Sequence, residues 1–438
     1  MGQRFIACDR EQVLLLPPDL REWLPAGHLA HFVIDTVAEL DLSAFYAAYR
    51  ADGWGRPAHD PAMMVALVLY AYARGERSSR VIERRCVEDV AVRVIAANQA
   101  PDHSTIARFI ERHQDALGGL FAQVLALCRR AGLVRAGVLA LDSTKIAANA
   151  SGRANLSYEQ IAREMIAEGI ATDRAEDELY GDARGDELPA ELADPTTRRE
   201  RLRAAKAELE AEWAAECQAR EAMLARRAEH RQKTGRNPGG RPPVRPVAES
   251  PQGRLNLTDR DSRPQRTPRG FIQGYNAQAV ATEDQIVVAT DVICRSADGG
   301  QLAPMIDAAV GALVEAGAGR PEVVLADAGY WSAPDIRQLT GQGLTVLVPP
   351  DAHAARAPNR SRTGGLYDQM RARLDTQEGR RLYRRRQATV EPIFGHTKHN
   401  RRLERFRRRG LAACRAEWRL ITATHNLLKL HKTAPAIA

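Results

Sequence analysis

The sequence lacks the features that mark membrane proteins, secreted proteins and zinc or redox proteins. Its longest apolar run, Ala62–Ala73, is shorter than the roughly 20 residues that a membrane-spanning helix needs. The first residues, MGQRFIACDREQ, have no apolar core of the kind that a signal peptide carries. The six cysteines are scattered without a CxxC pair, which predicts reduced, structural thiols. We therefore expect a cytoplasmic protein with no membrane partner, whose 438 residues form two or three globular domains.

What the chain has instead is positive charge, concentrated in two segments. The formal net charge is +8 and the sequence pI is about 9.3. Between Arg380 and Arg409, twelve Lys and Arg stand against two acids, and Arg231–Arg269 has ten Lys and Arg against three acids. The stretch Asp173–Asp194 reverses the sign, and we interpret it as a solvated surface. Two basic segments in one chain favour contact with a polyanion such as DNA.

Residues 1–135 are predicted to form a helical N-terminal domain for DNA binding or dimerisation. One helix should begin at Pro61 and another, RVIERRCVEDVAVRVI, should open at Ser78 and Ser79. Helix breaks are expected at Gly75 and at Gly118-Gly119.

A third predicted N-terminal helix, TIARFIERHQ, should be capped by Asp102 or Ser104. Two interpretations stay open for it. It is either the recognition helix of a helix-turn-helix motif or an ordinary packed amphipathic helix. If it contacts DNA, His103 and Arg108 are the candidate contacts.

Beyond residue 135 the pattern predicts an α/β domain interrupted by a helical insertion. Residues 155–269 form the insertion, with charged helices followed by a basic Pro/Gly-rich linker from about residue 236. Residues 136–154 and 270–438 carry the rest: a mixed five-stranded sheet with flanking helices. The expected order is a strand at 137–141, a hairpin at 275–293 turning at 283–284, a helix at 300–317, a strand at 322–326, a helix at 332–343, a strand at 344–349, and helices at 379–398 and 425–430.

Three acids stand where phosphodiester chemistry could use them. Asp142 and Asp327 each follow an apolar strand, and Glu391 is one of two acids in the strongly basic segment. Two hard cations, Mg²⁺ or Mn²⁺, take carboxylate oxygens as ligands and can activate the attacking oxygen while stabilising the leaving one. Singly, such an Asp is more often a turn or helix cap, and such a Glu a salt-bridged surface residue. Together the three acids predict a site for two metal ions.

Four stretches of the chain resemble the DDE transposases of bacterial insertion sequences, in the group with a Tyr-Arg-Glu-Lys signature. These stretches are LDSTKIAANAS, GYNAQAVATEDQIVVATDV, VLADAGYWS and VEPIFGHTKHNRRLERFRRRGLAACRAEWRLITATHNLLKL. In addition, LPPDLREWLPAGHLAHFVIDTV and GRPAHDPAMMVALVLYAYARGERSSRVIERRC resemble that group's helical, InsH-like N-terminal domain. The resemblance implies an RNase H-like catalytic domain in which Asp142, Asp327 and Glu391 are the metal ligands. It also implies that Lys398, seven residues after Glu391, contacts phosphate at the transposon end.

The same resemblance assigns Tyr383 and Arg386 to the Tyr and Arg of the signature, although Arg386 and Glu391 enclose four residues where the signature has three. Trp331, two residues after Gly329, is similar in place to an aromatic that stacks on an extruded base in this group. Arg401 and Arg402 would extend the DNA-contacting basic face.

The implied partners are double-stranded DNA, as terminal inverted repeats and as target, and a second copy of the chain on DNA. Two other functions stay open: a transposase-derived DNA-binding protein without catalysis, and an RNase H-like endonuclease that cuts but does not join. The presence of all three acids disfavours the first, and strand-transfer products would exclude the second.

Overall fold

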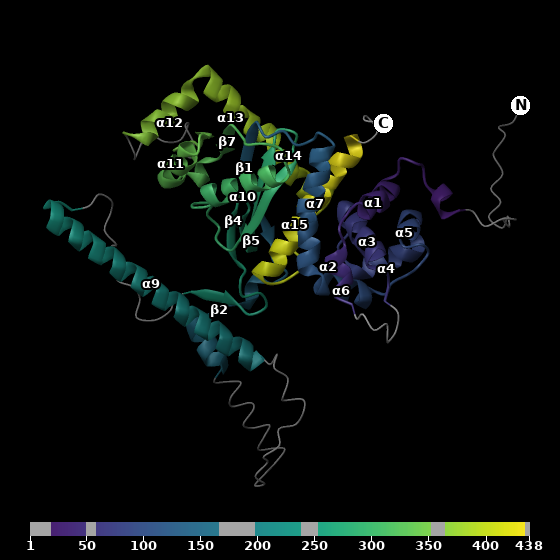
Figure 1. The fold of residues 1–438 in the computed structure, drawn as a ribbon. Helices are drawn as coiled ribbons and strands as arrows, with labels where there is room; N and C mark the ends of the chain where they lie inside the picture. Colours follow the sequence, from purple (N-terminus) through teal and green to yellow (C-terminus); the bar gives the residue numbers. More distant parts are fainter. Residues whose placement is uncertain (1–18, 50–57, 166–197, 238–252, 352–363, 434–438) are drawn as a thin grey trace, which may run out of the picture.

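The structure, a computed structural model, describes residues 19–49, 58–165, 198–237, 253–351 and 364–433 (Figure 1). The predicted acidic surface segment, Asp173–Asp194, lies outside the described residues. So does the middle of the predicted linker, residues 238–252. In the described parts of the chain, no helix is both long enough and apolar enough to cross a membrane.

A mixed sheet forms the centre of the molecule. Its neighbouring strands follow the order β4-β5-β1-β7-β8, and β6 pairs with β5. The predicted sheet had five strands, and β4 is the sixth. The strands are β4 (Arg263–Thr267), β5 (Gly270–Thr282), β1 (Val138–Ala147), β7 (Val323–Ala326), β8 (Thr345–Leu347) and β6 (Val287–Ile293).

Strand directions follow from the apolar pattern and the turns. β7 and β8 run parallel to β1, whereas β5 runs antiparallel to it and to β6. The β5–β6 hairpin turns at Glu283 and Asp284, as predicted, and a register shift interrupts it at Val280/Ala281. The short parallel strands are almost completely apolar because they are buried on both faces.

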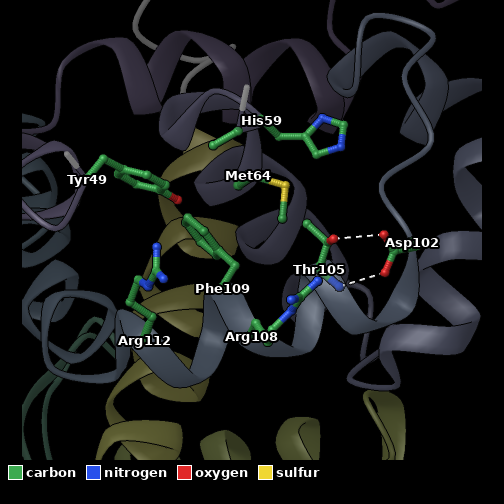
Figure 2. Close-up of a pocket in the computed structure, with 9 residues that line it drawn as sticks. Tyr49, His59, Met64, Asp102, Thr105, Arg108, Phe109 and Arg112 are labelled. Atoms are coloured by element: carbon green, nitrogen blue, oxygen red, sulfur yellow. Dashed lines mark hydrogen bonds between the residues drawn. The ribbon is translucent and has the colours of Figure 1, made fainter. Parts of the chain in front are cut away.

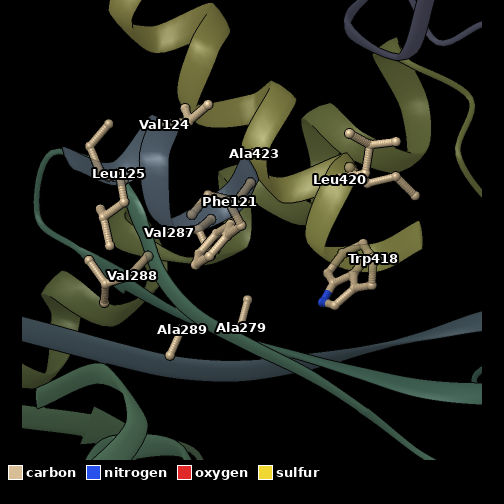
Figure 3. Close-up of a cluster of buried hydrophobic side chains, with 14 of the residues drawn as sticks. Phe121, Val124, Leu125, Ala279, Val287, Val288, Ala289, Trp418, Leu420 and Ala423 are labelled. Carbon is tan, nitrogen blue, oxygen red and sulfur yellow. The ribbon is translucent and has the colours of Figure 1, made fainter. Parts of the chain in front are cut away.

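Helices from both ends of the chain cover the sheet. α10 (Leu302–Glu315) packs on β6 and β5, and α11 (Ala333–Gly341) packs on β8. α15 (Leu411–Thr433) packs on β6 and on the N-terminal α7 (Gln114–Arg130). Figure 3 shows the shared interior, where side chains of α7 and α15 meet those of β5 and β6. The buried residues of the N-terminal helices and of the sheet therefore form one continuous core.

The expected helix break at Gly118-Gly119 is wrong, because α7 runs through both glycines. A Cβ added to Gly118 would lie 3.7 Å from the Cα of Ala416 in α15. The small residue serves close helix packing at this point rather than a turn.

The remaining N-terminal helices lie together on one side of the molecule (Figure 1). Asp60 caps α3 by accepting a hydrogen bond from the Met63 N–H, which confirms a helix start at Pro61. Gly75 has φ +83°, and a Cβ there would lie 2.3 Å from the carbonyl oxygen of Arg401, so only glycine fits. These helices are η1 (Leu20–Trp23), α1 (Leu29–Ala38), α2 (Ser43–Tyr46), α3 (Pro61–Ala73), α4 (Ser79–Glu88), α5 (Val90–Ile95) and α6 (His103–Arg112).

One predicted N-terminal helix is two helices. The sequence pattern runs unbroken from residue 80 to 95, yet α4 ends at Glu88 and α5 begins at Val90. Asp89 takes an extended conformation, and its carboxylate accepts from the Ala91 and Val92 N–H groups. A side-chain cap therefore competes successfully with continuation of the helix.

The insertion has a small core of its own. The long helix α9 (Arg198–Thr234) projects away from the sheet, on the side away from the N-terminal helices (Figure 1). Beside it, β2 (Asn155–Ser157) pairs with β3 (Arg254–Asn256). The core consists of Ile161, Leu202, Ala205, Leu209 and Leu255. Part of the predicted linker is thus regular structure, because β3 and β4 both lie within it.

The predicted basic helix at 379–398 is also divided. α12 (Leu366–Asp375) leads to α13 (Gln377–Thr389), which ends just before α14 (Glu391–Gly395) and a π-helical turn, η4 (His396–Asn400). Pro392 has no N–H to offer the Ala388 carbonyl, and the Gln285 Nε2 donates to that carbonyl instead, at 2.8 Å.

Candidate active site

The parallel pairing of β1 and β7 brings two of the predicted acids together. Leu141 pairs with Ala326, so the next residues, Asp142 within β1 and Asp327 directly after β7, are neighbours, because adjacent strands lie about 4.8 Å apart. Asp327 directly follows β7, as predicted. Asp142 was expected at a strand end but lies within β1, which continues to Ala147.

Asp142 is held by two donors. Its Oδ1 accepts from the Ser143 N–H at 2.7 Å, and its Oδ2 accepts from Arg386 Nη1 at 2.8 Å. The side chain is only 16% exposed. Burial raises the pKa of Asp142 to about 6, against the opposing effect of the Arg386 charge. The carboxylate therefore needs neighbouring positive charge to stay ionised at low cost.

Asp327 caps the short helix η3 (Ala328–Tyr330). Its Oδ1 accepts from the Gly329 N–H at 2.8 Å. Burial raises the pKa of Asp327, and the nearby Asp298 carboxylate raises it further. Two partly buried carboxylates, one within β1 and one directly after β7, are thus fixed by backbone N–H groups, one by that of Ser143 and the other by that of Gly329.

Glu391 joins the pair through an arginine. It is the first residue of α14, its side chain is 48% exposed, and its Oε1 accepts from Arg386 Nη2 at 3.2 Å. Arg386 therefore donates to Asp142 with one nitrogen and to Glu391 with the other. Burial alone would lower the pKa of Arg386, but Asp142 and the other negative groups around it raise it overall.

The donor set suits a hard divalent cation. Carboxylate oxygens are what Mg²⁺ and Mn²⁺ prefer, and Asp142 and Asp327 are two such groups whose burial makes added positive charge favourable. Among the described residues, no three His, Cys, Asp or Glu side chains converge closely enough to hold a metal ion. Glu391 is linked to Asp142 by the Arg386 guanidinium rather than by direct contact.

The sequence interpretation missed a fourth acid, Asp298. Its Oδ1 accepts from Asn276 Nδ2 at 2.7 Å and from Gln278 Nε2 at 3.0 Å, and it lies 3.7 Å from Lys145 Nζ. A Cβ added to Gly329 would lie 3.0 Å from Asp327 Oδ1 and 3.3 Å from Asp298 Oδ2. Both carboxylates thus face the same glycine.

A signal for Asp298 was present in β5. Asn276 and Gln278 are completely buried amides, and such groups need hydrogen-bond partners. The Tyr330 hydroxyl donates to Gln278 Oε1, which turns the amide nitrogen of Gln278 toward Asp298. A pair of amides at alternate strand positions could have indicated a buried acid nearby.

Both remaining signature positions lie close to this site. Lys398 Nζ donates to the Lys145 carbonyl on β1 at 2.7 Å, and burial lowers the pKa of Lys398. The Tyr383 ring lies 6.0 Å from the Arg386 guanidinium carbon and is partly buried against the core. The strand β1 thus carries both Asp142, which accepts from Arg386, and Lys145, whose carbonyl accepts from Lys398.

Two of the residues predicted to contact DNA, Arg401 and Trp331, contact other parts of the protein. Arg401 is 4% exposed, and its guanidinium donates to the carbonyls of Ile421 and Tyr72 and to the Thr424 hydroxyl. The prediction that Arg401 extends a DNA-contacting face is therefore wrong, whereas Arg402 is exposed.

Trp331 also has a protein partner. Its ring lies 4.8 Å from that of Tyr367, and the side chain is partly buried. Sequence position alone could not show that neighbour, because Tyr367 lies 36 residues further along the chain.

The helix α6 carries the predicted N-terminal DNA contacts and borders a pocket of about 450 Å³ (Figure 2). Asp102 is its cap, accepting from the Thr105 N–H at 2.8 Å. Arg108, together with Arg112 and Tyr49, lines the pocket. His103 Nδ1 lies 2.9 Å from Glu83 Oε2, so it pairs with α4.

Comparison with protein families gives two matches. Residues 18–112 match a transposase domain (DUF772), and residues 353–431 match a transposase DDE domain. No curated protein and no solved structure matches the chain. The first match covers α1 to α6, and the second covers Arg386, Glu391 and Lys398. Asp142 and Asp327 lie outside both matched segments, so their assignment depends on the β1–β7 register.

Proposed function

We propose that this protein is a DNA transposase of the insertion-sequence type, acting on DNA in the bacterial cytoplasm with an RNase H-like catalytic domain. Two transposase-domain matches support the general function. The strand order β6-β5-β1-β7-β8, with only β5 antiparallel to the others, supports the RNase H-like fold. The observation that carries the proposal is the placement of Asp142 beside Asp327, with Arg386 joining Asp142 to Glu391.

The proposed catalytic domain consists of residues 136–154 and 270–438, with β4 of the 155–269 insertion added at its sheet edge. Residues 1–135 would serve DNA binding and dimerisation. A homodimer on DNA follows from the need to process two transposon ends together.

The three acids would hold two Mg²⁺ or Mn²⁺ ions, which supply activation of the attacking oxygen and stabilisation of the leaving oxygen. The chain contributes the orientation of its own groups. The N–H groups of Ser143 and Gly329 fix the carboxylates of Asp142 and Asp327. Arg386 and Lys398 would place positive charge on the DNA phosphate, with Tyr383 packed beside Arg386.

The proposed reaction has two steps. In the first, water attacks a phosphorus at the transposon end, a new P–O bond forms, and the bond to the 3′ oxygen breaks to leave a 3′ hydroxyl. In the second, that hydroxyl attacks a phosphorus of the target DNA and displaces the target's own 3′ oxygen. Trp331, Arg402 and, in the N-terminal helices, His103 and Arg108 are the proposed further DNA contacts.

A cleavage and joining assay tests this function. Asp142→Ala and Glu391→Gln should abolish Mg²⁺-dependent cutting and joining at the element's ends while leaving DNA affinity nearly unchanged. Glu322→Gln is the matched control, since Glu322 is an exposed acid at the opposite end of β7. Full activity in either site variant would overturn the assignment of the acids. Cutting without joined products from a 3′-hydroxyl donor would indicate an endonuclease, and binding without cutting by the unaltered chain would indicate an inactive derivative.

A further inference from the structure

The strands β4 and β5 form a hairpin that extends beyond the end of β1. The last β1–β5 pair is Ala147 with Gly274, and the Gln273 carbonyl still accepts from the Ala148 N–H at 2.9 Å, so residues 270–272 of β5 pair with β4 alone. Thr267 and Gly270 close the hairpin, and the Thr267 hydroxyl donates to the Gly270 carbonyl at 2.8 Å. We call residues 263–274 the basic hairpin.

One face of the basic hairpin is anchored to the protein. Gln265 is completely buried, and its Nε2 donates to the carbonyl of Cys294 at 2.7 Å. The Arg266 N–H donates to the Ser296 hydroxyl at 3.1 Å. These contacts hold the hairpin against the segment that follows β6.

The other face presents an aromatic ring to solvent. Phe271 is 74% exposed, more than any other exposed large hydrophobic residue in the described part of the chain. It pairs across the strands with Arg266, so the two side chains project from the same face. A single exposed aromatic is common on protein surfaces, so its charged surroundings and its anchored position decide whether it could contact a partner.

Exposed arginines lie in the basic hairpin and in the segment after β6 that anchors it. Arg266, Arg269 and Arg295 are exposed, and none of them forms an ion pair with a carboxylate of the described residues. By contrast, Arg263 on the anchored face pairs with Glu208 and Glu212 of α9. The unpaired arginines make the exposed face complementary to a polyanion.

Phe271 projects from the same face of β5 as Ala279, the partner of Asp142, because an even number of residues separates the two. Asp142 pairs with Ala279, and Phe271 precedes Ala279 by eight residues of the same strand. At about 3.4 Å per residue this places Phe271 about 27 Å from the level of Asp142. The same length along one DNA strand corresponds to about eight nucleotides.

We propose that the basic hairpin is a second DNA-binding element, which enters the major groove about eight nucleotides from the phosphate being cut. A two-stranded ribbon fits the width of the major groove, and a Phe side chain can contact thymine methyl groups there. Phe271 supplies the apolar contact, and Arg266, Arg269 and Arg295 contact the flanking phosphates. This inference rests on the proposed DNA substrate, but it concerns a surface that the three acids do not use.

Binding of a fluorescein-labelled mixed-sequence duplex by the full chain tests the hairpin. Phe271→Ala should weaken binding about tenfold at each salt concentration, with the dependence of log affinity on log salt unchanged. Arg269→Ala should instead lower that salt slope by about 0.9, the value for one lost phosphate contact. Val314→Ala, at a 54% exposed residue of α10, and Arg320→Ala, at an exposed residue shortly before β7, are the matched controls and should bind normally.

The position is tested by cross-linking. A photoreactive p-benzoylphenylalanine in place of Phe271 should attach to DNA about eight nucleotides from the cut. If Phe271→Ala and Arg269→Ala both bind the duplex normally, the inference about the hairpin is overturned. The proposed function would still stand in that case, provided that Asp142→Ala abolishes cutting. A change in oligomer mass for Phe271→Ala with unchanged DNA affinity would identify a protein interface and also overturn it. If the unaltered chain binds no duplex, the proposed function fails as well.

Discussion

The two basic regions of the chain put their charges to different uses. In the segment 380–409, several cations donate to the protein itself: Arg386 to carboxylates, Arg401 to interior carbonyls and Arg408 to the Ile110 carbonyl. In the basic hairpin, Arg266 and Arg269 face solvent without a carboxylate partner among the described residues. The larger charge run is thus partly structural, whereas Arg266 and Arg269 of the basic hairpin are presented outward and only its Arg263 is ion-paired. A count of charges predicts a polyanionic partner but not which cations meet it.

The strongest test of the structural role of the C-terminal segment is Glu417→Gln. Glu417 is buried in an ion pair with Arg77 at 2.8 Å, and it accepts from the N–H groups of Arg407 and Arg408. Removing its charge leaves Arg77 buried without a counter-charge, which should cost about 3–5 kcal/mol in free energy of unfolding. Urea denaturation of the variant measures this. A loss below about 1 kcal/mol would show that the buried Arg77–Glu417 ion pair does not hold the C-terminal segment in place.

Arg401 and Arg402 are adjacent in the sequence, but the first is buried and the second is exposed, so they allow a direct comparison of a structural and a surface arginine. Arg401→Ala should lower the free energy of unfolding by about 3 kcal/mol, because interior carbonyls lose their donor and a cavity forms. Arg402→Ala should change it by less than about 0.5 kcal/mol, since that side chain is exposed. Urea denaturation and duplex binding should be measured on both variants. Equal stabilities would contradict the buried placement of Arg401.

A smaller effect concerns pH and the buried His425. Burial lowers the pKa of His425 to about 3, and its Nε2 lies 3.0 Å from the Gln285 carbonyl oxygen. Above pH 6.5 the residue is neutral in both states. Between pH 6.5 and 3 only the unfolded chain takes up the proton, so stability falls by about 1.4 kcal/mol per pH unit.

At pH 5 the His425 contribution should amount to about 2 kcal/mol. His425→Gln should therefore lose less stability than the unaltered chain when urea denaturation at pH 5 is compared with pH 7. Other groups titrate in both proteins, so the difference between them isolates this residue. An identical pH dependence would show that His425 does not stay neutral in the folded chain.

Much of the sheet could be predicted from the sequence because its signals are local. Apolar runs ending at Asp327 and a polar turn at Glu283-Asp284 indicate the strand and the hairpin without any long-range information. The closeness of Asp142 and Asp327 was also predictable, since each follows an apolar run and the two runs pair as parallel strands, although β1 continues beyond Asp142 to Ala147.

What could not be predicted depends on distant partners. Gln285 satisfies the carbonyl that Pro392 leaves free and so allows the break after α13. The burial of Arg401 depends on carbonyls of α3 and α15, far from it in the sequence. The amides of β5 indicate that an acid lies nearby, but that this acid is Asp298 follows only from the folded chain. Each of these features results from contacts that no local pattern contains.

The central claim is that Asp142 and Asp327 form one cation site, and Mn²⁺ binding measured by electron paramagnetic resonance tests it most directly. Asp142→Asn and Asp327→Asn should each weaken Mn²⁺ binding at least about tenfold, whereas Glu322→Gln should bind as the unaltered chain does. Undiminished Mn²⁺ binding in both site variants would contradict the claim.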